Sequence, residues 1–389
     1  MKSRQFGISV VFGAILALAG CGARTGLLEE WERPDTDVDN APDSHTYFPC
    51  NYGTAYGLQD LLEPGLFDGM TFGPDLAFGQ DQLAATFIHA SVTLRERAAA
   101  FCATSHREEW MCQDFTSLGL ENSNRVQLGF DGRDFGVIVD ETTSSALTFA
   151  RINSDLELVD DPISLEVDMT GSLGEMIWVE DHYLLSVFLP SPLPEVNHGE
   201  LRVIRFTPET AGHVEEVVSL NTRLDAHDIA VSGDRVIAAG IDTENSLWVQ
   251  VIEPPGVRGE LILPPGSNYQ IAAALRIDPH IDDEAAILWM SHDESVGRIM
   301  MASFDLETGA ISDPIEVALV EFPTTFLGVD IVAVNVGYML AWTVQLDVLQ
   351  QQVIARPTRV NGWGNIELRS EIELHWGDGP WHRGIPQLP

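Results

Sequence analysis

The chain has 389 residues, of which 45% are hydrophobic and 21% are charged, so it holds enough apolar material for a large folded core and is neither collagen-like nor wholly disordered. Its 59 Asp and Glu residues outnumber its 21 Lys and Arg residues, which gives a formal net charge of -38. Nucleic acid is excluded as a partner, because a phosphate backbone is bound through clusters of basic side chains that this chain lacks.

The first residues predict an export signal over residues 1–20. Lys2 and Arg4 precede an uncharged run over residues 6–20, which is long enough for a signal-peptide core and short for a membrane span. The run ends in the motif LAGC, whose last residue is Cys21, and this motif resembles the lipobox of bacterial lipoproteins. The resemblance implies cleavage before Cys21, acylation of that cysteine and, with Gly22 behind it, sorting to a Gram-negative outer membrane. We therefore expect a lipid anchor, with the folded part facing the periplasm or the cell surface.

Residues 21–47 predict an acidic tether, because the stretch is too polar and too charged to fold alone. Its carboxylates at short spacing are Asp35, Asp37, Asp39 and Asp43. This spacing resembles the calcium loops of thrombospondin type 3 repeats, in which alternating carboxylates converge on one hard cation. The pattern departs from that family at Asn40, which replaces the turn glycine, and it occurs once. A calcium loop and a solvated linker are both open interpretations.

Three cysteines besides Cys21 remain in a compartment that permits disulfides. We expect Cys102 to pair with Cys112, because the enclosed loop is short and its closure stabilises the fold by about 3 kcal/mol in the chain-entropy model. Cys50 is then left over, or pairs outside the chain. Zinc is not predicted, since the cysteines lack the paired short spacing of zinc ligands.

Residues 48–380 predict one all-β domain built from repeats. Six units recur at intervals of roughly 45 to 57 residues, each with an apolar strand, a short turn and a second, more hydrophobic strand. The units begin at Asp75, Arg125, Glu175, Asp228, Ala273 and Asp330. Two further strand-like runs follow in each unit, so each predicts a four-stranded antiparallel sheet. Six such sheets around one axis resemble six-bladed β-propellers in general, and a seventh blade from residues 45–70 is left open.

One stretch of the first unit has a different periodicity. Residues 91–110 place Leu94, Ala98, Phe101 and Ser105 at helical spacing among good helix formers. We therefore expect either a helical insert in the first blade or a region that is not a blade.

Alignment of the units brings four acids to the entrance of the innermost strand. These are Asp75, Glu175, Asp228 and Asp330. We expect their carboxylates to gather at one mouth of the central channel, where they would raise one another's pKa or bind Ca²⁺. The alternative is that polar side chains line a water-filled channel without forming a site.

Two histidines fall near these positions. His227 lies beside Asp228 and is a candidate metal ligand or base. His182 ends the motif Glu180-Asp181-His182, which occupies the first turn of the third unit, and we interpret that motif as a charged hairpin tip.

The sequence contains no H-E-x-x-H, G-x-S-x-G or Walker A motif, and its only lysine is Lys2. We therefore predict a non-enzymatic lipoprotein whose propeller is a scaffold for an unknown protein or small ligand, neutral or basic in character. The alternative is a calcium-dependent propeller hydrolase of the lactonase or glycan-cleaving type, with the metal in the acidic ring. Adaptation to high salt is a third explanation of the charge.

Overall fold

A computed structural model describes residues 69–374 of the chain, with short segments left out. These segments are 79–81, 92–96, 106–110, 115–122, 142–146, 166, 168–171, 192–197, 211–212, 224–225, 265–266, 279–280, 293–295, 322–323, 335–336, 346–350 and 361–364. The predicted signal, the lipidation site Cys21, the tether with its four aspartates and Cys50 lie outside the described residues.

The described chain folds into six antiparallel sheets, and each sheet takes its strands consecutively from the sequence. The first three sheets contain β1 (Gly69–Phe78), β2 (Gln82–Ser91), β3 (Arg97–Ser105) and β4 (Met111–Asp114); β5 (Ser123–Phe130), β6 (Phe135–Glu141), β7 (Leu147–Ile152) and β8 (Ile163–Leu165); and β9 (Ser172–Val179), β10 (His182–Pro190), β11 (His198–Phe206) and β12 (Glu215–Arg223). A 3₁₀ turn, η2 (Pro208–Thr210), follows β11.

The last three sheets repeat this plan, with one added strand. They contain β13 (His227–Ser232), β14 (Arg235–Ile241), β15 (Ser246–Glu253) and β16 (Arg258–Ile262); β17 (Ser267–Asp278), β18 (Ile281–His292), β19 (Val296–Asp305) and β20 (Ile315–Glu321); and β21 (Thr325–Val334), β22 (Gly337–Gln345), β23 (Gln351–Val360), β24 (Ile366–Leu368) and β25 (Ile372–Leu374). The added strand β25 pairs with β23 beside β24.

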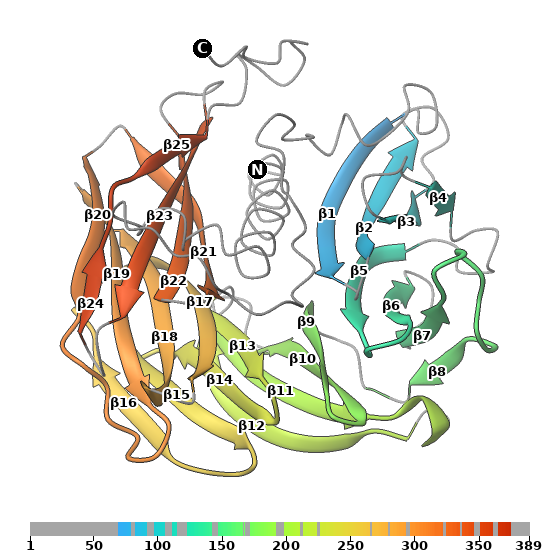
Figure 1. Cartoon of the computed structure of the whole chain (residues 1–389), viewed down its shortest axis with the longest axis horizontal. Coiled ribbons are helices and arrows are strands. Elements are labelled where there is room, and N and C mark those ends of the chain that lie inside the picture. The colour runs from blue at the N-terminus through green and yellow to red at the C-terminus, as the bar shows by residue number, and fades with distance from the viewer. Residues whose placement is uncertain are drawn as a thin grey trace, which may run out of the picture.

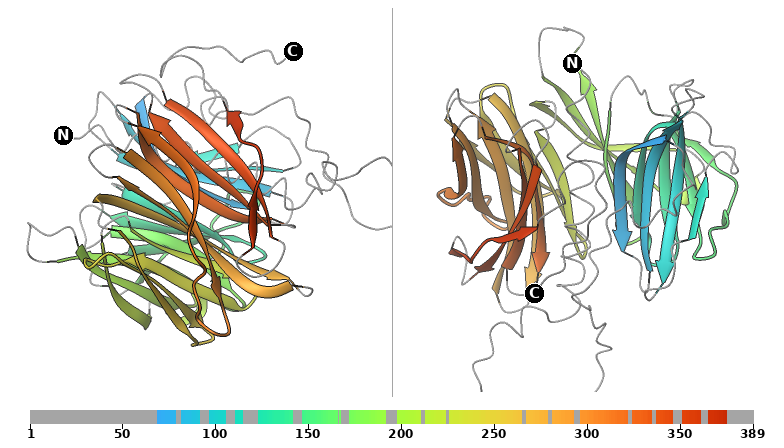
Figure 2. Two further views of the ribbon diagram at one scale, coloured as in Figure 1. Left: turned by 90° about the vertical axis from the view of Figure 1, so that its left-hand side faces the viewer. Right: turned by 90° about the horizontal axis from the view of Figure 1, so that it is seen from above.

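The six sheets form the blades of a β-propeller, as the repeats predict. Figure 1 and Figure 2 show them side by side in an arc, with the first strand of each blade on the inside and the fourth on the outside. The innermost strands contact one another in chain order, from β1 through β5, β9, β13 and β17 to β21. Blades 1 and 6 are the two ends of the described arc (Figure 1). The residues proposed for a seventh blade lie almost entirely outside the described chain.

The hydrophobic core is divided among the junctions between neighbouring blades. Each of five clusters combines buried side chains of two adjacent blades. In β10, Leu185 packs toward blade 2 while its neighbour Leu184 packs toward blade 4, and both are fully buried. A central blade strand is therefore apolar at consecutive positions, because both of its faces are covered. Burial of each such side chain contributes about 1.5 to 3 kcal/mol, so no blade is stable without its neighbours.

The helical insert predicted for residues 91–110 is wrong where the chain is described. Residues 97–105 form β3, and Ala100, Phe101, Cys102 and Ala103 are all buried. Phe101 and Ala103 pack against blade 2, so a strand with both faces covered produced the run of apolar residues that mimics helical spacing. Cys102 is disulfide-bonded, and Cys112 of β4 is its direct cross-strand neighbour. Pairing with Cys112 stays the prediction.

Candidate functional site

Three of the four aligned acids, Asp75, Glu175 and Asp330, lie within the innermost strands, whereas Asp228 is the second residue of β13 and lies at the entrance of its strand. Asp330 is in the middle of β21, which begins at Thr325, and Asp75 is likewise internal to β1. The predicted position at the strand entrance is therefore corrected for these three acids, because β1, β9 and β21 begin earlier than the apolar repeat indicates. The side chain of Asp75 is not described, whereas Glu175, Asp228 and Asp330 can be followed.

Asp228 connects three blades. Its Oδ1 accepts a hydrogen bond from the backbone N of Ile229 at 2.9 Å, and its Oδ2 accepts one from the backbone N of Ala273 in β17 at 2.6 Å. Its carboxyl group also shares a hydrogen bond with the side chain of Glu175 in blade 3. Ala273 is the residue that takes the acid's place in blade 5, and its small side chain leaves the backbone amide within reach. One carboxyl group therefore links blades 3, 4 and 5.

The pKa values of the central aspartates are displaced toward neutrality. Burial raises the pKa of Asp228 to about 7, against the opposing effect of its hydrogen bonds from Ala273, Ile229 and Glu175. Burial also raises the pKa of Asp330 to about 7, and the nearby charge of Asp228 adds to that rise. These carboxyl groups thus exchange protons near neutral pH, as carboxylates gathered in a low-dielectric environment do.

Glu175, Asp228 and Asp330 therefore lie near enough to interact, but they are not arranged as metal ligands. Within the part of the chain that the structure describes, no three His, Cys, Asp or Glu side chains are placed to hold a metal ion. Calcium binding by the ring that includes Asp75 stays a prediction.

His227 faces away from the acids. Its ring stacks on Phe188 of β10, with centroids 5.4 Å apart and an interplanar angle of 9°. Burial lowers the pKa of His227 to about 4, so the ring is neutral at pH 7. Alternation along β13 explains this placement, because successive side chains of a strand point to opposite faces.

A second polar centre lies in a cavity of about 550 Å³ between blades 3 and 4. Among its lining residues, Nε2 of His182 lies 2.9 Å from Oε2 of Glu253, and Nδ1 lies 2.9 Å from Oδ1 of Asp181. Arg205 of β11 donates to the other oxygen of Glu253 and also lies 3.6 Å from Glu215. The Glu253 side chain is 7% exposed, whereas that of Asp181 is 88% exposed. The buried carboxylate of blade 4 is thus bound by two side chains of blade 3.

Sequence reasoning missed this centre. The motif Glu180-Asp181-His182 does form the predicted hairpin turn, and Glu180 has the positive φ of 49° that a tight turn demands. The hairpin interpretation is incomplete, however, because His182 is buried against the next blade. The available signal was Glu253, an acid that ends the mostly apolar strand β15 and therefore needed a buried partner.

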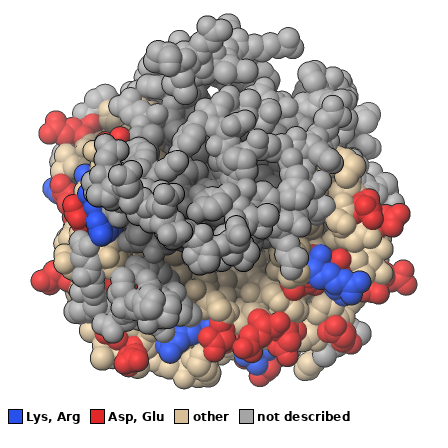
Figure 3. All heavy atoms as spheres, viewed as in Figure 1, with Lys and Arg blue, Asp and Glu red and all other residues tan. Residues whose placement is uncertain are grey.

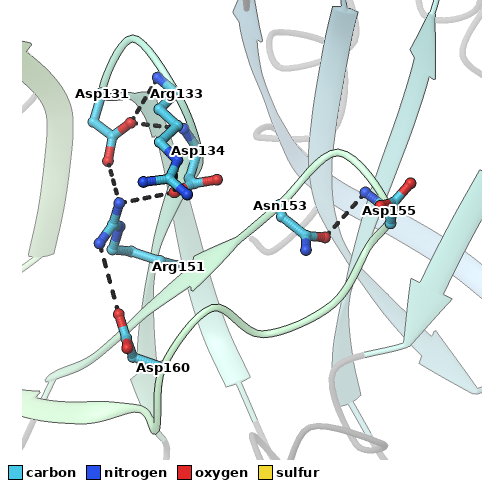
Figure 4. A network of polar contacts seen from close by, with 7 residues as sticks. All are labelled: Asp131, Arg133, Asp134, Arg151, Asn153, Asp155 and Asp160. Carbon is cyan, nitrogen blue, oxygen red and sulfur yellow. Dashed lines mark hydrogen bonds and ion pairs between the residues drawn. The ribbon is translucent and has the colours of Figure 1, made fainter.

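Blade 2 contains a related network, and all of its members belong to that one blade. Arg151 of β7 lies 2.8 Å from Asp134, 3.2 Å from Asp131 and 3.6 Å from Asp160 (Figure 4). Asp131 also accepts hydrogen bonds from the backbone N of Arg133 and of Asp134, which holds the β5–β6 turn over the arginine.

Figure 3 shows that Asp and Glu side chains are spread around the visible rim, while Lys and Arg side chains occupy a few separate places.

Comparisons with known proteins identify no family. No protein-family model matches the chain, and no curated protein matches it. Solved structures are similar to it at low sequence identity. They include SapL1 lectin in complex with alpha methyl fucoside, at 9% identity over 79% of this chain and 95% of that one, with a TM-score of 0.46.

Two further similar structures come from Pyrococcus species. One is the β-propeller domain of the Trilobed protease from Pyrococcus furiosus, at 9% identity over 81% of this chain and 98% of that one, with a TM-score of 0.38. The other is an acylaminoacyl peptidase from Pyrococcus horikoshii, at 7% identity over 74% of this chain and 51% of that one, also with a TM-score of 0.38.

In the described part of the chain, no helix has the length and apolar character needed to cross a membrane.

Proposed function

We propose that this chain is an extracytoplasmic, lipid-anchored binding scaffold, in which the propeller presents a ligand site and Cys21 carries the anchor. The observation that supports binding is the cavity between blades 3 and 4. Two packed sheets build it, and charged side chains from both blades converge on it. The propeller fold by itself assigns no activity, because this architecture carries many unrelated functions.

Binding is tested by a thermal-shift screen of the full chain against a mixed library of sugars, peptides, amines and metal ions. We expect at least one compound to raise the melting temperature, since a ligand that binds only the folded state stabilises it. Pro255→Trp fills the cavity and should abolish the shift. Pro264→Trp, at an exposed proline outside the cavity lining, is the matched control. A shift that survives Pro255→Trp, or no shift with any compound, contradicts the proposal.

The anchor is tested separately in a Gram-negative host. The lipobox-like motif supports the expectation that Cys21→Ala moves the protein from the membrane fraction to the soluble fraction and removes labelled palmitate from it. Cys50→Ala is the control and should leave both readouts unchanged. Membrane association that persists in Cys21→Ala argues against the lipid anchor.

A propeller hydrolase is the second candidate function, and the central aspartates favour it. A carboxyl group whose pKa is about 7 is suited to give and take a proton at neutral pH. We expect Asp228→Asn to abolish any hydrolysis of lactones or glycosides found in a substrate panel. If the ring also binds calcium, calcium should raise the melting temperature of the wild type and not that of Asp228→Asn. Absence of turnover with calcium present would remove this candidate.

A further inference from the structure

The cavity between blades 3 and 4 carries more negative charge than its own cations neutralise. Arg205 is bound by Glu253 and Glu215, and the ring of His182 lies between Glu253 and Asp181. The basic side chains of the lining are therefore already engaged with carboxylates of the protein, and an anionic ligand would have to displace those carboxylates.

Two carboxylates of the lining have no such engagement. Glu180 belongs to the β9–β10 turn of blade 3, and Asp234 belongs to the corresponding β13–β14 turn of blade 4. Among the described residues neither makes an ion pair, and both are exposed. Equivalent turns of adjacent blades thus place one free carboxylate each along the same cavity.

The remaining residues of the lining are uncharged, and most of them are apolar. Val179 is buried beneath the turn of blade 3, and Pro254 and Pro255 follow Glu253 in blade 4. An apolar wall next to unpaired carboxylates suits a ligand that has a hydrocarbon stem and a charged end, because the stem covers apolar surface while the head group stays with its counter-ions.

We propose that this cavity binds a primary ammonium group carried on an apolar stem, with Glu180 and Asp234 as its counter-ions. This assignment rests on the proposed binding function and specifies its ligand. A compact ammonium group has three donors that can reach carboxylates approaching from two separate turns. A guanidinium group fits less well, because its planar fork matches a single carboxylate facing it in one plane.

The composition of the chain favours the same ligand. With Lys2 inside the predicted signal, the exported chain contains no lysine that could occupy the site from within. The net charge of -38 also attracts cations toward the whole surface. Because this general attraction affects every acid, the test must separate the two lining carboxylates from the rest of the surface.

The ammonium group has two possible sources, a free small amine or a lysine side chain of another protein. Calorimetric titration of the full chain with cadaverine tests the first source. Titration with a capped pentapeptide that contains a single central lysine tests the second. We expect Glu180→Gln/Asp234→Asn to weaken binding of the active probe by about tenfold or more, as loss of two direct counter-ions does.

The control variant removes two exposed acids elsewhere and changes the net charge equally. Glu307→Gln/Asp313→Asn lies in blade 5, and we expect it to change affinity by less than about twofold, because distant surface charges are screened. Pentanol, a neutral analogue, should not bind. Both variants must keep the wild-type melting temperature.

Each outcome has a definite meaning. Binding of either probe that depends on Glu180 and Asp234 supports the assignment and identifies the source. Equal loss in the control variant, or no binding of either probe, overturns it. If the mixed library yields only ligands without an amine, and Pro255→Trp abolishes their binding, the binding scaffold stands while the ammonium site falls.

Discussion

Arg151 in blade 2 and Arg205 in blade 3 occupy the same place, the next-to-last residue of the third strand, yet their surroundings differ. All three carboxylates around Arg151 come from its own blade, and its side chain is 17% exposed. Arg205 takes its closest carboxylate from blade 4, and its side chain is 35% exposed. An arginine at this position thus binds carboxylates of its own blade in blade 2, whereas in blade 3 it links that blade to blade 4.

The turn between the first two strands explains the difference. In blade 2 it runs from Asp131 to Asp134, and it is long enough to fold its own aspartates over Arg151. In blade 3 it contains only Glu180 and Asp181, and neither of them forms an ion pair with Arg205. Glu253 of the next blade supplies the missing charge, and the space that a longer turn would fill remains as the cavity. Turn length therefore decides whether this part of a blade is structural or accessible to a ligand.

The largest effect is expected from Glu253→Gln. The change leaves Arg205 and His182 without the buried carboxylate that binds both, and breaking such a pair on one side costs about 3 kcal/mol of unfolding free energy. Urea denaturation measures it. Glu260→Gln breaks the exposed pair with Arg258, which are 2.8 Å apart, and should cost less than about 1 kcal/mol. Equal losses in the two variants would show that Glu253 does not join the blades.

The central aspartates extend the comparison, because they are half-buried and form no ion pair with a described cation. Their folded pKa of about 7 exceeds the ordinary value of 3.8, so the folded state binds protons that the unfolded chain has released. Stability therefore falls as the pH rises through this interval and levels off above pH 7. We expect the stability of the wild type in urea denaturation to fall between about pH 5 and pH 8 relative to Asp228→Asn/Asp330→Asn.

His227 acts in the opposite direction at lower pH. Its folded pKa of about 4 lies below the ordinary value of 6.5, so its contribution to stability is lost as the pH falls through that interval. Both proteins in the comparison retain His227, and its effect therefore cancels in the difference. Parallel pH profiles for the wild type and the double variant would refute the raised pKa values.

A smaller effect is expected in blade 2. Asp134→Asn removes the closest partner of Arg151, but Asp131 and Asp160 still surround the guanidinium group. We expect a loss of about 1 kcal/mol by urea denaturation, below that of Glu253→Gln, because the remaining carboxylates compensate. A loss larger than that of Glu253→Gln would show that the network within blade 2 contributes more to stability than the network between blades 3 and 4.

The smallest effect is expected from Asp181→Asn. Asp181 is the exposed partner of His182, and the hydrogen bond from that ring lowers the pKa of Asp181. Since water solvates this carboxylate in both states, we expect no measurable change in the urea midpoint. A change as large as that of Glu253→Gln would mean that the exposed partner, and not the buried one, fixes His182.

Much of the fold was predictable because a propeller repeats one local pattern. All six units begin with a described hairpin, and the further strand runs of units three to six are also strands. Residues 97–105 were misassigned, since a run such as Ala100 to Ala103 is apolar on both faces in a blade and does not distinguish strand from helix. The alignment also brought Glu175, Asp228 and Asp330 into one neighbourhood, although it misplaced them along their strands.

The amino-acid sequence by itself determined the repeat, the six sheets and the acidic character, because hydrophobic periodicity and charge are properties of the local chain. It did not determine the polar centre between blades 3 and 4. His182 and Glu253 are 71 positions apart, and each is unremarkable within its own blade. Only the packing of one sheet against the next brings them within hydrogen-bond distance and leaves a cavity beside them. Contacts between blades depend on the angle and spacing of whole sheets, which no local pattern encodes.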